Sequence, residues 1–135
     1  MSVVLDASVW VSASISDDVH HQTTRAWLSR VSSTDTLVTP ALGLLETAGA
    51  VARRTGSSAL AREIVTAIER LPNVVVVIPD AELWTLAVHA ASGRALRGAD
   101  ALYVALAEAL GMPLATWDDE QRTRAGRRIK TLTPA

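Results

Sequence analysis

The sequence contains no cysteine in its 135 residues. This absence excludes disulfides, zinc–thiolate sites and thiol nucleophiles within the chain. No segment approaches the run of about 20 apolar residues that a membrane-spanning helix needs, and the start of the chain has no apolar stretch typical of a secretory signal. We therefore expect a cytoplasmic protein without a membrane partner.

Aromatic residues are scarce, with four tryptophans, one tyrosine and no phenylalanine. The tryptophans are scattered along the chain. This distribution favours anchors in a core or an interface over a platform on which nucleic-acid bases stack. They are Trp10, Trp27, Trp84 and Trp117.

The chain also lacks a marked excess of charge, because its formal net charge is −1 at pH 7. This balance excludes a globally basic nucleic-acid binder, but it says nothing about local patches. Five basic residues and no acidic one lie between positions 122 and 130, directly after the acidic residues 118–120. This run is either a solvated helix face or a set of phosphate contacts. The candidate RNA contacts are Arg122, Arg124, Arg127 and Arg128.

The length predicts one domain spanning residues 1–135. Short apolar, β-branched runs alternate with segments of helical periodicity, which is typical of an α/β fold with a parallel sheet covered on both faces. We expect Pro40 at the first position of a helix, Asp80 as a helix N-cap and Gly111 at a helix end. The expected strands are residues 3–5, 36–39, 74–78, 114–116 and 129–132.

Four acidic residues lie in apolar or small surroundings where strands are expected to meet helices. They are Asp6, Glu46, Asp100 and Asp118. An ionised carboxylate out of water must be paired, protonated or bound to a metal ion. In a parallel sheet, ligands bind beyond the carboxyl ends of the strands. We expect the first and last of these acids at strand ends and the other two in first helical turns at the same edge, where their oxygens suit Mg²⁺ or Mn²⁺.

Each acid also has a structural alternative. Asp6 is a possible helix N-cap, Glu46 a possible partner of a remote arginine, and Asp100 a possible partner of a helix dipole. Strand alternation selects Asp118 over its neighbour Asp119, which is more typical of a cap or a solvated charge, although it remains a candidate for binding metal through water.

Four segments that carry these residues resemble the motifs of PIN-domain ribonucleases, in particular VapC-like toxins of bacterial type II toxin–antitoxin pairs. The segments are VVLDASVWV, TPALGLLETAGAV, LRGADALYVALA and LATWDDE. By this resemblance the acids of the four motifs are the catalytic and metal-binding residues. Ser8 and Thr116 are the accompanying hydroxyls.

The resemblance implies a three-layer α/β/α domain with a five-stranded parallel sheet in the order 3-2-1-4-5. It also implies a homodimer, a cognate VapB-like antitoxin, and hydrolysis of RNA phosphodiesters that depends on Mg²⁺ or Mn²⁺. Arg94 and Arg97, just before Asp100, are candidates for a phosphate contact or a structural role.

Two alternatives belong to other functional classes. A signalling receiver domain is also a small α/β domain with acids at strand ends, but its phosphorylated aspartate would follow the third strand, where Asp80 is expected to cap a helix instead. A catalytically silent PIN-fold binding module would not need all four acids.

Overall fold

The computed structural model describes residues 2–135 and contains a five-stranded parallel sheet in the order β3-β2-β1-β4-β5. The strands are β1 (Val3–Leu5), β2 (Leu37–Pro40), β3 (Val74–Val77), β4 (Leu114–Ala115) and β5 (Thr131–Leu132). The helices are α1 (Ala7–Ser14), α2 (His21–Val31), α3 (Ala41–Thr55), α4 (Ser58–Glu69), α5 (Ala81–Arg94), α6 (Gly98–Leu110) and α7 (Asp119–Arg124). The predicted fold class and strand order are therefore confirmed.

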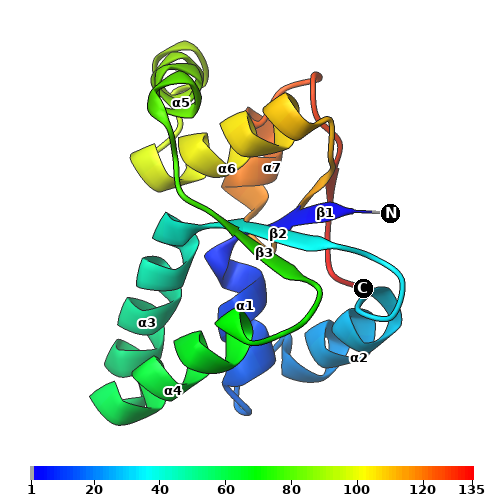
Figure 1. Cartoon of the computed structure of the whole chain (residues 1–135), viewed down its shortest axis with the longest axis vertical. Helices are drawn as coiled ribbons and strands as arrows, with labels where there is room; N and C mark the ends of the chain where they lie inside the picture. Colours follow the sequence, from blue (N-terminus) through cyan, green and yellow to red (C-terminus); the bar gives the residue numbers. More distant parts are fainter. Residues whose placement is uncertain (1) are drawn as a thin grey trace.

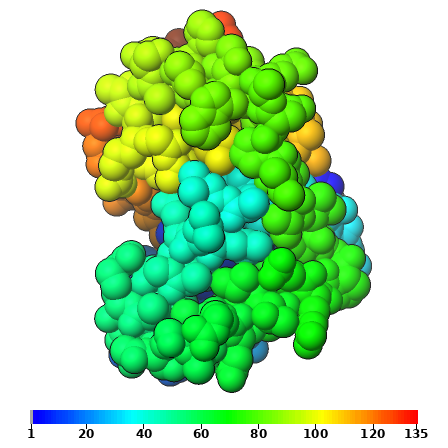
Figure 2. All heavy atoms as spheres, turned by 60° about the vertical axis from the view of Figure 1, so that its left-hand side comes forward, coloured from blue at the N-terminus to red at the C-terminus, as the bar shows by residue number. Residues whose placement is uncertain are grey.

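Helices cover both faces of the sheet, with α5, α6 and α7 on one side and α1 to α4 on the other (Figure 1). Alternate residues of a strand face opposite layers, and β1 follows this rule. Val4 packs in the cluster formed with α5 and α6, whereas Val3 and Leu5 pack in the cluster formed with α1 and α2. The same two halves are visible on the surface, where α5 and α6 lie above α3 and α4 (Figure 2).

Burial of every strand on both faces was expected, and for β3 this prediction is wrong. Val75 is 47% exposed, because β3 forms one edge of the sheet and pairs only with β2. The central strands β1 and β2 are buried throughout, as predicted. The site residues are attached to this rigid centre.

Several boundaries differ from the predicted ones by one or two residues. Pro40 closes β2 in an extended conformation and precedes α3, so it is not the first helical residue. Thr116 lies one residue beyond β4, where its backbone N still donates to Leu132 O of β5 and its hydroxyl accepts a hydrogen bond from Asp118 N. The predictions for Asp80 and Gly111 are confirmed: the former caps α5 by accepting from Leu83 N, and the latter ends α6 with φ of 64°.

The topology brings distant segments to one edge of the sheet. Strands β1 and β4 are neighbours at its centre, so the residues that follow them lie close together. Helix α3 begins directly after β2, on the other side of β1. Across residues 2–135, no helix is long and apolar enough to cross a membrane.

Candidate metal-binding active site

Asp6 follows β1 and is buried. It caps α1, since its Oδ1 accepts from Ser8 N at 3.0 Å, and it also accepts hydrogen bonds from the hydroxyls of Ser8 and Thr116. Burial raises the pKa of the Asp6 carboxyl to about 6, against the opposing effect of these hydrogen bonds. The cap alternative is thus correct as geometry, but a cap does not require a carboxylate to be buried this deeply.

The two supporting hydroxyls lie around Asp6. The Thr116 hydroxyl donates to Oδ2 of Asp6. The oxygen of the Ser8 hydroxyl lies 3.5 Å from the Thr116 hydroxyl oxygen. Ser8 Oγ in turn accepts from Trp117 N at 2.9 Å. These contacts link the start of α1 to the segment after β4, and they hold the Asp6 carboxylate in one orientation.

Glu46 was expected in the first turn of a helix, but it is the sixth residue of α3. This prediction is wrong. The hydroxyl of Tyr103 on α6 donates to Glu46 Oε1 and accepts from Ala7 N at 3.1 Å. Burial raises the pKa of Glu46, and the nearby Asp100 charge adds to this effect, while the hydrogen bond from Tyr103 opposes it. The alternative partner for Glu46 was a remote arginine. Its hydrogen-bond donor is instead the buried phenol of Tyr103.

Asp100 and Asp118 share one cation, the guanidinium of Arg97. Its Nε lies 3.3 Å from Asp100 Oδ2, and its Nη2 lies 3.3 Å from Asp118 Oδ2. Burial raises the pKa of Asp100, although Arg97 opposes the shift. Asp118 also caps α7, since its Oδ1 accepts from Glu120 N and Gln121 N. Arg97 therefore balances charge inside the acidic cluster.

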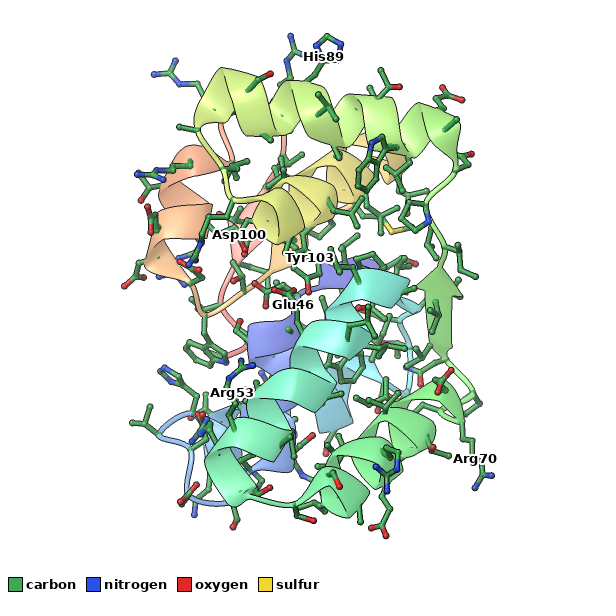
Figure 3. All side chains as sticks on the ribbon, turned by 90° about the vertical axis from the view of Figure 1, so that its left-hand side faces the viewer. Glu46, Arg53, Arg70, His89, Asp100 and Tyr103 are labelled. Atoms are coloured by element: carbon green, nitrogen blue, oxygen red, sulfur yellow. The ribbon has the colours of Figure 1, made fainter. Side chains whose placement is uncertain are left out.

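The four carboxylates line one cavity of about 330 Å³, together with Arg97 and Tyr103. Figure 3 shows Glu46 and Tyr103 facing each other between α3 and α6, with Asp100 close above them. No histidine, cysteine or lysine of the described chain lines this cavity. Asp119 does not line it either, because its side chain is 88% exposed and pairs with Arg122.

Mg²⁺ and Mn²⁺ prefer hard oxygen ligands, and the four carboxylates supply them. Within residues 2–135, no three acidic or histidine side chains are arranged as a ready metal site. Existing contacts explain why the acids are not arranged as a ready metal site. Hydroxyls donate hydrogen bonds to Asp6, the Tyr103 phenol donates one to Glu46, and Arg97 forms ion pairs with the other two acids. A guanidinium already lies between two of the carboxylates, so the cluster accepts positive charge there. The chemistry of the oxygen donors therefore fits a divalent ion.

The basic run after Asp118 is largely paired with acidic residues. Arg122 pairs with Asp119, Arg124 with Glu120 at 2.6 Å, and Arg128 with Glu108 at 3.2 Å. Pairing reduces the charge that these arginines offer to a phosphate. Their assignment as RNA contacts, together with that of the exposed Arg127, stays a prediction.

Arg94 and Arg97 differ in role. Arg94 donates to Ala125 O at 2.7 Å and pairs with Glu108, so it ties α5 to the end of α7. Arg97 lines the acidic cavity. Of the two residues singled out before Asp100, only Arg97 belongs to the site.

A family model described as the PIN domain matches residues 3–127 of this chain. The chain belongs to the PIN-domain family. This match confirms the predicted family, and it spans all four acidic motifs.

Solved structures of VapC and VapBC proteins have the same fold. The chain is similar to the VapC20 toxin of Mycobacterium tuberculosis, with a TM-score of 0.75 and 21% identity over 95% of this chain and 98% of that one. VapBC2 of Rickettsia felis, bound to promoter DNA, gives a TM-score of 0.75 at 14% identity, covering 98% of each chain. VapBC-1 of nontypeable Haemophilus influenzae gives 0.69 at 17% identity, covering 99% of this chain and 98% of that one. A search of curated proteins found no match.

The sequence reasoning missed the contribution of Tyr103. A signal was present, because Tyr103 is the only tyrosine and lies three residues after Asp100, on the same side of a helix. A small residue near Glu46 makes room for this tyrosine. A Cβ at Gly43 would lie 2.9 Å from both the Tyr103 hydroxyl and Thr39 Oγ1. The space at Gly43 thus admits the phenol that holds Glu46.

Proposed function

We propose that this PIN domain, spanning residues 1–135, is a Mg²⁺- or Mn²⁺-dependent endoribonuclease and the toxin of a VapBC-type toxin–antitoxin pair. The observation that supports it most is the convergence of four carboxylates in one cavity that holds no histidine, cysteine or lysine from the described residues. Hydrolysis of a phosphodiester by such a set needs a metal ion and no protein nucleophile.

Asp6, Glu46, Asp100 and Asp118 are the residues that would hold the ion. When bound, it supplies positive charge to the scissile phosphate and lowers the pKa of attacking water. The protein's own groups orient these ligands: Ser8 and Thr116 hold Asp6, and Tyr103 holds Glu46. Arg97 offsets the negative charge of the remaining pair, Asp100 and Asp118, and its guanidinium would suit contact with a phosphate.

Several observations support the proposed partners. The similar structures include VapBC assemblies from Rickettsia felis and Haemophilus influenzae, which supports a cognate VapB-like antitoxin. The VapC20 toxin is described as cleaving the sarcin–ricin loop, which supports RNA as the substrate class. The exposed apolar residues Ile78, Trp84 and Val88 on and before α5 offer surface for a homodimer. A cytoplasmic location fits an RNA substrate.

The receiver-domain alternative does not fit the topology. Receiver domains have the flavodoxin-like order 2-1-3-4-5, in which the chain reverses after the first strand pair, whereas this sheet has the order 3-2-1-4-5. Asp80 also caps a helix. A catalytically silent PIN module remains the alternative that activity measurements must exclude.

The purified protein should cleave single-stranded or loop RNA with Mg²⁺ or Mn²⁺ and leave 5′-phosphate ends. A divalent ion held by these carboxylates would activate water for attack on phosphorus, with the 3′ oxygen as the leaving group and without attack by the 2′-hydroxyl. Gel assays with end-group analysis check this result, and sequencing of new 5′ ends after brief expression in bacteria would name the target. Cleavage in excess chelator, or products with 2′,3′-cyclic phosphates, would contradict the proposal.

Tyr103→Phe should reduce cleavage about tenfold and lower the free energy of unfolding by about 1 kcal/mol, the usual contribution of one hydrogen bond. The variant keeps the buried ring but removes the hydroxyl that donates to Glu46 and accepts from Ala7 N. Since that hydrogen bond lowers the pKa of Glu46, its loss should raise this pKa.

The measurement that separates positioning from simple stability is the pH–rate profile. Its acidic limb should move to higher pH in Tyr103→Phe. Gly43→Ala, which crowds the same hydroxyl, should move the limb in the same direction. A profile identical to that of the parent in both variants would assign Tyr103 a purely structural role.

A further inference from the structure

A second cavity adjoins the acidic one and has about 630 Å³ of space. Its walls come from α1, α3, the residues before α2 and the segment after β4. Ala7, Ser8 and Glu46 line both cavities. A molecule bound at the carboxylates therefore continues directly into this second space, which we call the flanking cavity.

One wall of the flanking cavity is an aromatic pair. Trp117 and His20 are stacked, with ring centroids 3.7 Å apart and an interplanar angle of 5°. Trp117 Nε1 donates to Thr24 Oγ1 at 2.9 Å, and its backbone N donates to Ser8 Oγ at 2.9 Å. Trp117 is only partly buried, although two contacts hold its indole and a third holds its backbone. A pre-ordered aromatic surface loses little entropy when a further ring stacks on it.

The opposite wall, on α3, carries a cation without an ion-pair partner in the described chain. Arg53 points along the helix past Gly49, and its Nη1 lies 3.1 Å from the place of a Cβ on that glycine. Its neighbour Arg54 is instead paired with Asp17 and Asp18. Figure 3 shows Arg53 further along α3 on the same side as Glu46. Arg53 is thus available to an anion in the cavity.

We propose that the flanking cavity binds the nucleotide of single-stranded RNA that adjoins the scissile phosphate. Its base stacks on the Trp117 side of the aromatic pair, and its other phosphate contacts Arg53. This inference rests on the proposed ribonuclease function. An aromatic surface and an unpaired arginine on either side of a space that opens onto metal-binding carboxylates match the two recurring contacts of single-stranded nucleic acids. If a protein segment occupied the flanking cavity instead, its binding would require neither the unpaired Arg53 nor the residues that the two cavities share.

The stacking contact is tested with two variants of one residue. Trp117→Leu and Trp117→Phe both remove the Nε1 donor to Thr24, but only the second keeps an aromatic ring. Affinity for a fluorescein-labelled, mixed-sequence single-stranded oligoribonucleotide is measured by anisotropy in chelator, where cleavage does not occur. Trp117→Leu should bind about 5- to 140-fold more weakly than Trp117→Phe, as expected for loss of one base–aromatic stack.

The phosphate contact is tested by salt dependence. Arg53→Ala should weaken binding and reduce the slope of log affinity against log salt by about 0.7, the value for one phosphate contact on a single strand. Arg70→Ala is the matched control, because Arg70 is an exposed arginine on the far side of α4 (Figure 3). It should leave the slope unchanged.

Equal affinity of the leucine and phenylalanine variants, with a parental salt slope in Arg53→Ala, overturns the proposal and leaves the cavity to a protein segment. The ribonuclease function is tested separately, by measuring RNA cleavage by the parent protein with Mn²⁺. A parent that does not cleave but loses oligonucleotide affinity in these variants supports the binding site and rejects the enzyme. A parent that cleaves while the variants bind normally rejects only the binding site.

Discussion

Asp6→Asn is expected to reduce RNA cleavage at least a hundredfold while the metal-free variant melts at or above the melting temperature of the metal-free parent. Asp6 is buried among hydroxyls, and no cationic side chain of residues 2–135 pairs with it. Its negative charge therefore lowers the stability of the metal-free protein, and under the proposed function the same carboxylate would bind the metal ion. Loss of the charge removes both effects together.

Asparagine is a suitable replacement at this position. It is as good a helix N-cap as aspartate, so the hydrogen bond from Ser8 N is kept. Its amide can donate to Thr116 Oγ1, because the Thr116 hydroxyl can turn to Gln121 Oε1, which lies 3.3 Å away. The substitution thus changes charge with little change in packing.

The measurements are cleavage rate and thermal melting with and without Mn²⁺. The parent should gain stability with Mn²⁺ by mass action, and Asp6→Asn and Asp100→Asn should gain clearly less. Asp119→Asn is the matched control, since this acid is exposed and outside the cavity. It should keep both activity and the response to Mn²⁺.

Two results would count against the site. If Asp6→Asn and Asp100→Asn melt well below the parent and respond to Mn²⁺ as it does, both acids are structural. If Asp119→Asn loses the response instead, the ligand after Thr116 is Asp119 and not Asp118.

The metal-free parent should lose stability relative to Asp6→Asn as pH rises from about 4 to about 7. The folded pKa of Asp6 is about 6, above the ordinary value of 3.8 for an aspartate, so in this interval the folded state binds more protons than the unfolded state. The stabilisation from protonated Asp6 is fully present below pH 3.8 and is lost as pH rises through about 6. The expected change is about 3 kcal/mol at 1.36 kcal/mol per pKa unit.

Urea denaturation of both proteins in chelator, at several pH values, measures this difference. Other carboxylates titrate in both proteins, so their contributions largely cancel in the comparison. The pKa values of Glu46 and Asp100 are also raised by burial. The free energy of unfolding of the variant should therefore still fall as pH rises, but by less than that of the parent. A constant difference between parent and variant across this range would mean that Asp6 remains ionised when folded.

Local sequence patterns were sufficient to predict the fold class, the family and several helix ends of this protein. Alternation of β-branched runs with helical periodicity indicated the α/β class, and the four acidic motifs indicated the family and the strand order. Asp80 and Gly111 marked helix ends correctly, because capping depends on one or two residues and their own backbone. The isolation of Asp6 and Glu46 among apolar residues was also visible in the chain itself.

The tertiary structure alone decided which groups surround each acid. Arg97 bridges Asp100 and Asp118, and Tyr103 reaches Glu46 across two helices. Trp117, expected as a core or interface anchor, instead forms a partly exposed wall beside the site. These contacts join residues far apart in sequence, and their energies depend on burial and distance, which no local pattern encodes. Residue types determined what chemistry was available, and packing decided which group contacts each carboxylate.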